Sequence, residues 1–189
     1  MTDPLHADAV SRLSAWAPST SALKVLRERY LTHLQSYADA LTRPCYPAHL
    51  TASSLVLSAD GSRALLTLHA KAQAWFQLGG HCEPGDLTLA AAALREATEE
   101  SGIAGLAIDP LPFYADDHAV PFCAASQGQA APVRHYDVWF VVTAPEGAAF
   151  ERSEESLSLK WWPLSDLPGG EPVWGNALQA LRERQRHHR

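Results

Sequence analysis

Residues 79–103 read GGHCEPGDLTLAAAALREATEESGI. The opening of this stretch is rich in glycine and contains a proline, which favours a loop. From Leu87 the composition changes to residues that form helices well, chiefly alanine, leucine and glutamate, and Gly102 is well placed to end a helix. The sequence therefore predicts a glycine-rich loop over residues 78–86 that leads into a helix from Leu87 to Ser101.

Three glutamates share one face of this predicted helix. Glu96, Glu99 and Glu100 stand at positions i, i+3 and i+4, so their carboxylates converge and repel one another. A hard divalent cation such as Mg²⁺ would relieve that repulsion, because it prefers carboxylate oxygens. The neighbouring Arg95 can steady one carboxylate by a bidentate contact. The alternative is a solvated acidic helix face, which is the more common meaning of a charge run.

The order of the loop and the helix resembles the Nudix box. Gly79-Gly80-His81-Cys82-Glu83-Pro84-Gly85-Asp86 is followed by Arg95-Glu96-Ala97-Thr98-Glu99-Glu100-Ser101-Gly102-Ile103. The second segment matches the family pattern at every specified position. Two departures stand in the first: Asp86 replaces a glutamate, and eight residues instead of seven separate it from Arg95. An insertion inside the helix would rotate its face by about 100°, so we expect the additional residue in the loop, around Leu87 to Leu89.

The resemblance implies a fold, a reaction and a cofactor. The fold would be α/β, a Nudix-type α/β/α sandwich with a mixed sheet, and the reaction the hydrolysis of a nucleoside diphosphate linked to another moiety. Mg²⁺ or Mn²⁺ would be held by Glu96, Glu99, Glu100 and the carbonyl oxygen of Gly79, while Arg95 would orient Glu96. The metal would lower the pKa of the attacking water and neutralise the diphosphate.

The sequence offers candidates for the general base in two regions. In this family it is either a glutamate of the box, here Glu96, or a glutamate of a later loop. Glu154 and Glu155 stand in the corresponding region, just before a predicted strand over 157–162. Their other interpretation is a pair of exposed loop acids.

Four residues are candidates for contact with the substrate. The backbone at Gly80 can approach a ligand closely, and His81 follows it directly. His118 lies in a predicted long loop over 116–131, where selection of the substrate could occur. Asp137 is placed on one face of a predicted strand over 133–142. For His81, His118 and Asp137 the alternatives are a structural loop histidine, a solvated acidic loop and a solvent-facing strand side, respectively.

The rest of the chain divides into an N-terminal helical extension over residues 1–45 and a Nudix domain over 46–189. Within the extension we expect helices from Ala7 to Trp16 and from Ser21 to Leu41, the second with an apolar stripe that must be buried on this domain or on a second copy, as in a homodimer. The domain should contain a hairpin with Asp60-Gly61 at its tip, further strands, and a last helix. The other strands are predicted over 75–76, 104–108, 133–142 and 157–162, and the last helix over 176–184.

Composition excludes several classes of function. The chain has 189 residues and a formal net charge of −6, and its one dense basic run is the C-terminal end, so we expect no nucleic-acid partner. Apolar runs are too short to cross a bilayer, so no membrane association is expected. Three scattered cysteines and an acidic N-terminus without a signal peptide favour a cytoplasmic protein. The expected partner is a small nucleoside diphosphate derivative.

Two other functions compete with hydrolysis. Isomerisation of isopentenyl diphosphate occurs on a similar fold, but it needs a cysteine where this chain has Gly79, although His81 would suit it. A non-catalytic module that binds a nucleotide or a protein is the second, and such modules usually have eroded boxes. The sequence does not identify the substrate, because Ala119 stands where ADP-ribose hydrolases often have proline and Tyr114 is too early for the tyrosine of dinucleoside polyphosphate enzymes.

Overall fold

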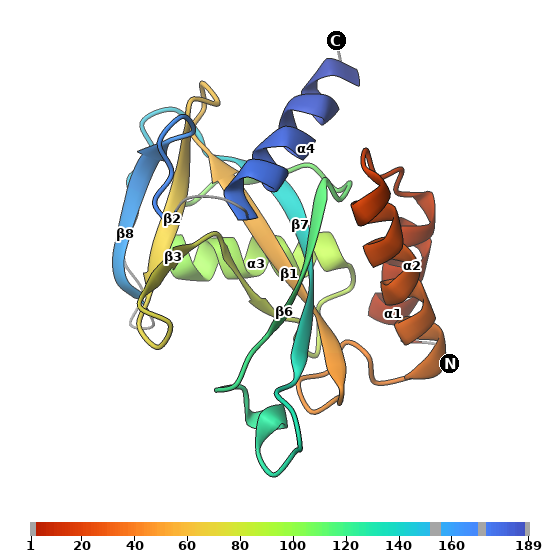
Figure 1. Cartoon of the computed structure of the whole chain (residues 1–189). Helices are drawn as coiled ribbons and strands as arrows, with labels where there is room; N and C mark the ends of the chain where they lie inside the picture. Colours follow the sequence, from red (N-terminus) through yellow and green to blue (C-terminus); the bar gives the residue numbers. More distant parts are fainter. Residues whose placement is uncertain (1–2, 152–155, 170–172, 188–189) are drawn as a thin grey trace.

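The computed structural model describes residues 3–151, 156–169 and 173–187. Helices and strands alternate irregularly along the chain (Figure 1), in the order α1 (Pro4–Ala15), α2 (Ser21–Ser36), β1 (Ala48–Leu57), β2 (Arg63–His69), β3 (Ala74–Phe76), β4 (Leu78–His81), α3 (Leu89–Ser101), β5 (Ala107–Ile108), β6 (Tyr114–Ala119), the short 3₁₀ helix η1 (Ala124–Ser126), β7 (Arg134–Thr143), β8 (Ser156–Pro163) and α4 (Val173–His187). None of the helices in these ranges is long and apolar enough to span a membrane.

The strands form one mixed sheet. Its main path runs β3-β2-β1-β7-β5, while β4 pairs with β1, β6 with β7 and β8 with β2. Strands β1 and β7 are parallel along their whole length, from Ala48 opposite Arg134 to Leu57 opposite Thr143, and the other pairs are antiparallel. Every residue of β1 is buried, because the strand lies inside the sheet with helices over it. The expected α/β sandwich with a mixed sheet is therefore confirmed.

Helix α3 covers one side of this sheet and packs on β1 and β4 (Figure 1). Its first turn is capped by the Thr88 hydroxyl, which accepts from the backbone N–H of Ala91, and Gly102 ends it with φ of 65°. Small and apolar side chains pack on the sheet, and Glu96 and Glu100 approach it where β4 passes the helix. The helix is continuous from Leu89 to Ser101, so the longer spacing after Asp86 does not interrupt it.

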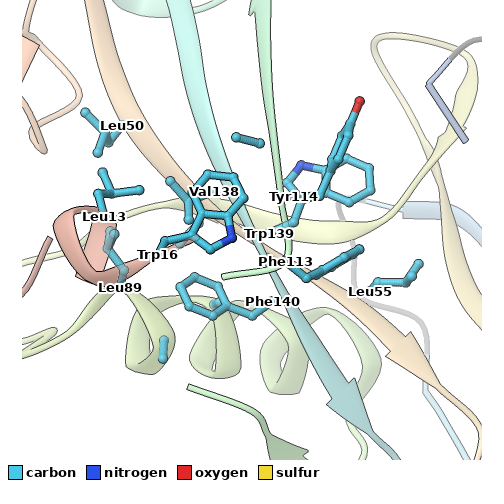
Figure 2. Packing of buried hydrophobic residues seen from close by; sticks show 14 of the residues in the cluster. Leu13, Trp16, Leu50, Leu55, Leu89, Phe113, Tyr114, Val138, Trp139 and Phe140 are labelled. Atoms are coloured by element: carbon cyan, nitrogen blue, oxygen red, sulfur yellow. The ribbon is translucent and has the colours of Figure 1, made fainter. Parts of the chain in front are cut away.

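The N-terminal helices pack on the same core. Leu13 of α1 and Trp16, which directly follows that helix, belong to the same buried cluster as Leu89 of α3 and Phe140 of β7 (Figure 2). Asp8 of α1 also accepts a 2.9 Å hydrogen bond from the backbone N–H of Leu89. An acid at this place stabilises the start of α3 through the helix dipole. The apolar stripe of the extension is thus buried on its own chain.

Helix α2 is attached to the sheet by aromatic and polar contacts. Tyr30 is fully buried, its ring stacks on Tyr136 at 4.6 Å, and its hydroxyl donates to the Asp116 carbonyl oxygen at 2.6 Å. The predicted extent to Leu41 is wrong, since α2 ends at Ser36 and successive turns carry the chain to β1. Leu41 is nevertheless buried, although it lies in a turn and not in the helix.

Sheet pairing changed three further expectations. The predicted loop over 116–131 begins as β6, which pairs with β7 and places Asp116 opposite Asp137. The glycine-rich loop begins as β4, which pairs with β1. The strand predicted over 104–108 is only Ala107–Ile108. In each case the partner strand, rather than local propensity, determines the structure. The hairpin, β3, β7, β8 and the last helix are confirmed, with small differences in their ends.

Candidate active site

The three box glutamates lie on the last turns of α3, under strand β4. The Glu96 side chain is 17% exposed and that of Glu99 is 60% exposed. The backbone N–H of Gly79 donates to Oε2 of Glu100 at 3.0 Å, which joins the strand to the helix. A Cβ atom at Gly80 would lie only 2.7 Å from the Glu96 carboxylate carbon. The second glycine is therefore needed for the strand to lie this close to the acids.

Arg95 connects the helix to the loop that precedes it. Its guanidinium donates to both oxygens of Asp86 at 3.2 and 3.0 Å, and to the His81 carbonyl oxygen at 3.0 Å. It also donates to Glu96 at 3.0 Å and to Glu99 at 3.1 Å. These bonds, first of all that to Asp86, raise the pKa of Arg95. The aspartate that replaces the family glutamate thus fixes the arginine, and through it the position of Glu96.

The donor set at this face suits a hard divalent cation. All of its candidate ligands are oxygens, from three carboxylates and one backbone carbonyl group, which is the chemistry that Mg²⁺ and Mn²⁺ prefer. Burial raises the pKa of Glu96, an effect that Arg95 opposes and Glu99 reinforces. Three carboxylates thus lie close together beside the glycine strand, with the single guanidinium of Arg95 to balance them, so a divalent cation would add the positive charge that they need.

Asp137 lies on a buried face of β7, which contradicts the alternative of a solvent-facing strand side. A solvent-facing side is therefore wrong for this strand, because Trp139, two residues further on the same face, packs against Trp174 of α4. Asp137 is 2% exposed and accepts from Thr51 at 2.8 Å, Ser53 at 2.7 Å and Gln77 at 3.1 Å. Burial raises its pKa, against the effect of these hydrogen bonds and of His118. Since Ser53 lies opposite Gly79 in the β1–β4 pair, Asp137 supports the strand that closes the acidic face.

His81 and His118 belong to a separate group of rings. His81 Nε2 lies 3.1 Å from His49 Nε2, and the His81 and His135 rings are 4.9 Å apart. Burial, with smaller effects of Arg43 and His49, lowers the pKa of His81 to about 3. His118 is on strand β6 and not in the predicted loop. The centre of its ring lies 5.5 Å from that of the His135 ring. Burial opposes its protonation, but the hydrogen bond to Asp116 and nearby acids raise its pKa overall.

Sequence reasoning missed His49 and Cys123, which complete this group. Neither stands near the box in the sequence, and no local spacing links them to it. These residues are brought together by the register of the sheet, which places His49 opposite His135 and His135 opposite His118.

Glu154 and Glu155, the candidate bases, lie outside the described residues. The described chain just before them runs past the end of α3. There the backbone N–H of Glu151 donates to the Ser101 carbonyl oxygen at 2.8 Å. A Cβ atom at Gly102 would also lie 3.3 Å from Glu151. The segment that leads to the two glutamates therefore starts at the C-terminal end of the acidic helix.

Comparison with known proteins agrees with this geometry. The NUDIX domain model matches residues 47–182. An Ap4A hydrolase from C. elegans, in a binary complex, has 19% identity and a TM-score of 0.56, with 73% of this chain and 98% of that chain covered. The MutT protein from Methanosarcina mazei Go1 has 18% identity and a TM-score of 0.53, with coverage of 73% and 96%. Comparison with curated protein sequences gave no match.

A further solved structure extends the range of relatives. The dihydroneopterin triphosphate pyrophosphohydrolase of E. coli has 18% identity and a TM-score of 0.52, with coverage of 70% of this chain and 92% of that one. At this level of identity the structures are alike in fold. The family model covers most of the chain and includes the glycine strand, Arg95 and the acidic helix. The chain therefore belongs to the Nudix family.

Proposed function

We propose that the protein is a pyrophosphohydrolase that cleaves a nucleoside diphosphate linked to another moiety, with Mg²⁺ or Mn²⁺ as cofactor. One observation carries the proposal. Glu96, Glu99 and Glu100 form an acidic face that β4 closes at hydrogen-bond distance. A face of this kind is costly without a cation, and a diphosphate needs the same cation to be neutralised.

Each residue of the site would have a distinct role. Glu96, Glu99, Glu100 and the Gly79 carbonyl oxygen would hold the cation, which when bound supplies charge neutralisation and an activated water. Arg95 would fix the Glu96 carboxylate through its 3.0 Å hydrogen bond and keep it ionised. The backbone at Gly80 would allow the diphosphate to approach, because no side chain intervenes.

The proton acceptor is proposed to be Glu154 or Glu155, with Glu96 as the alternative. The acidic helix carboxylates would be engaged with the cation, which makes them poor bases. A carboxylate that reaches the site from the segment after Glu151 would have free lone pairs. The contact of Glu151 with the end of α3 supports this choice, since it starts that segment beside the site.

The substrate class rests on the type of site and on the relatives. Proteins named for hydrolysis of Ap4A and of dihydroneopterin triphosphate have this fold, and both names denote phosphoanhydride substrates. We place the partly buried His81 and the buried Asp137 in positioning roles, while the exposed His118 stays a candidate for contact with the substrate. We also propose that residues 46–189 form the catalytic unit and residues 1–45 its docked extension.

The two competing functions are less well supported. Gly79 leaves the isomerase without its cysteine, and a side chain there would meet Ser53 at 2.4 Å. A non-catalytic module would not need Arg95, Asp86 and the glutamates in one hydrogen-bonded array.

A panel of nucleoside diphosphate derivatives tests the proposal directly. With Mg²⁺ present, at least one compound should release phosphate or a nucleoside monophosphate, and Glu99→Gln or Glu100→Gln should lower turnover at least ~10²-fold. Glu146→Gln is the matched control, because Glu146 is exposed and far along the chain from the box. Near-normal turnover in Glu100→Gln at saturating Mg²⁺ would reject the assigned ligands, and no turnover with any compound would favour the binding module.

A further inference from the structure

Three histidines and a cysteine gather on the sheet in a group that is distinct from the acidic face. The side chains are those of His49, His81, Cys123 and His135, and one ligand atom from each lies within 4.8 Å of all the others. His49 and Cys123 are buried, and the other two are half-buried. The closest pair is His49 Nε2 and His81 Nε2 at 3.1 Å, and Cys123 Sγ lies 4.0 Å from His81 Nε2.

The register of three strands builds this group. His49 on β1 lies directly opposite His135 on the parallel strand β7. His81 ends β4, which pairs with β1 on the side opposite β7, so the His81 ring reaches the same place from the other side of β1. Cys123 lies in the turn after β6. Its backbone N–H donates to the Val120 carbonyl oxygen at 3.1 Å, which holds the turn together. Four segments that are far apart in the sequence therefore converge on one point.

The ring nitrogens are arranged as those of metal ligands are. His49 Nδ1 donates a hydrogen bond to the Cys45 carbonyl oxygen at 3.1 Å, so the lone pair of His49 is on Nε2, which faces His81 Nε2 within the group. His135 Nε2 is buried and has no hydrogen-bond partner among the described residues. Burial lowers the pKa of His135 to about 2, so this ring is neutral at physiological pH. A buried polar atom without a partner is uncommon in proteins and points to a missing ligand.

We propose that His49, His81, Cys123 and His135 bind Zn²⁺. Imidazole nitrogens and thiolates are both ligands of zinc, and a tetrahedral structural site takes four of them from the protein, the number gathered here. With Zn–N of about 2.0–2.1 Å and Zn–S of about 2.3 Å, adjacent ligand atoms of such a site are roughly 3.3–3.6 Å apart. The His49–His81 separation is 3.1 Å and no separation in the group exceeds 4.8 Å, so closure around zinc would change distances between ligand atoms by up to about 1.5 Å.

This zinc site and the acidic face would select different metals. The acidic face offers only oxygens, which suit Mg²⁺, while nitrogen and sulfur ligands suit zinc. Binding would release the thiol proton, and the thiolate would offset part of the charge that Arg43 adds to the surroundings of His135. With four protein ligands no coordination position stays open, so the site would be structural and would take no direct part in hydrolysis.

The zinc site would attach the turn after β6 to the strand that closes the acidic face. Cys123 would be joined to His81, which directly follows Gly80. The His81 carbonyl oxygen also accepts a hydrogen bond from Arg95. Removal of zinc would therefore loosen this turn and weaken the support of β4, with loss of thermal stability as the first consequence.

The test uses the full-length protein, stripped with a chelator and reloaded with Zn²⁺ or Co²⁺. We expect about one tightly bound zinc per chain by elemental analysis. At free Zn²⁺ about a thousandfold above Kd, the melting temperature should rise by about 8–16 °C. Co²⁺ should give the absorption of a tetrahedral site with a thiolate-to-cobalt charge-transfer band. The double variant Glu99→Gln/Glu100→Gln should keep this zinc, which separates it from the metal of the acidic face.

Two variants with one matched control assign the ligands. Cys123→Ser should abolish the charge-transfer band and weaken zinc binding at least ~10²-fold, whereas Cys82→Ser, at the neighbouring buried cysteine, should leave both unchanged. His135→Ala should weaken binding to the same extent. If His135→Ala fails to fold, the band in Cys123→Ser decides. Less than about a tenth of a zinc per chain after reloading, or a charge-transfer band that survives in Cys123→Ser, would overturn the proposal.

Discussion

Replacement of Arg95 perturbs the acidic face without removing any of its acids. The guanidinium makes five hydrogen bonds, and their partners differ in exposure. The bond to Glu99 contributes little, because that side chain is 60% exposed. The Asp86 and Glu96 side chains are only 8% and 17% exposed, so they would be left with uncompensated charge. Removal of one partner from a buried ion pair lowers the free energy of unfolding by about 3–5 kcal/mol.

Because the Arg95 side chain is itself 22% exposed, we take the lower end of that range for Arg95→Ala. A loss of about 3 kcal/mol corresponds to a melting temperature lower by about 6–12 °C in a chain of this size. Arg95→Lys keeps the charge but cannot bond to four groups at once, and should lose roughly half as much. Since Glu96 would no longer be held, the affinity for Mn²⁺ should fall by about 10- to 100-fold.

Calorimetric titration of Mn²⁺ and thermal unfolding of the metal-free protein provide the assay. Arg186→Ala is the matched control, since Arg186 is exposed on α4. If Arg95→Ala melts like the parent protein and binds Mn²⁺ with unchanged affinity, Arg95 does not position Glu96 and this reasoning fails.

Four further expectations concern other residues of the chain. Glu154→Gln or Glu155→Gln should lower turnover by ~10²- to 10⁴-fold with Mn²⁺ affinity unchanged; full turnover in both would place the base within the box. Gly80→Ala should keep the fold but displace the Glu96 carboxylate, measured as weaker Mn²⁺ binding. Gly79→Ala, with φ of 151° and a clash against β1, should instead lower the melting temperature. Deletion of residues 1–45 should give a destabilised or aggregating protein, and an equally stable, soluble product would show that the extension is only a tether.

The sequence was most informative where structure is local. The helix that bears Arg95 could be predicted because its capping residues, its apolar side and its terminal glycine are all within one short segment. The pairing of Glu96, Glu99 and Glu100 on one face follows from helical geometry alone. The Arg95–Asp86 contact forms despite the longer spacing, since the loop before the helix accommodates the additional residue.

Features that depend on strand register could not be predicted. Asp137 was expected on a solvent-facing side, but neighbouring elements that are remote in sequence bury it. His49 joins His81 because β1 pairs with β4 and with β7 at particular positions, and Cys123 joins them because β6, the strand before it, pairs with β7. A shift of one residue in the pairing would turn Asp137, His49 and His81 to the other face of the sheet, and no local pattern fixes that choice.

The most direct test of the proposed hydrolysis is turnover in ¹⁸O-labelled water, with a substrate found in the nucleotide panel. Attack of water on phosphorus should place one ¹⁸O in a phosphoryl product in the presence of Mg²⁺ or Mn²⁺. The rate of incorporation should fall at least ~10²-fold in Glu99→Gln and stay normal in Glu146→Gln. Product formed without ¹⁸O in any phosphoryl group, or incorporation that is independent of Glu99 and of added metal, would contradict the assignment of this acidic face as the catalytic centre.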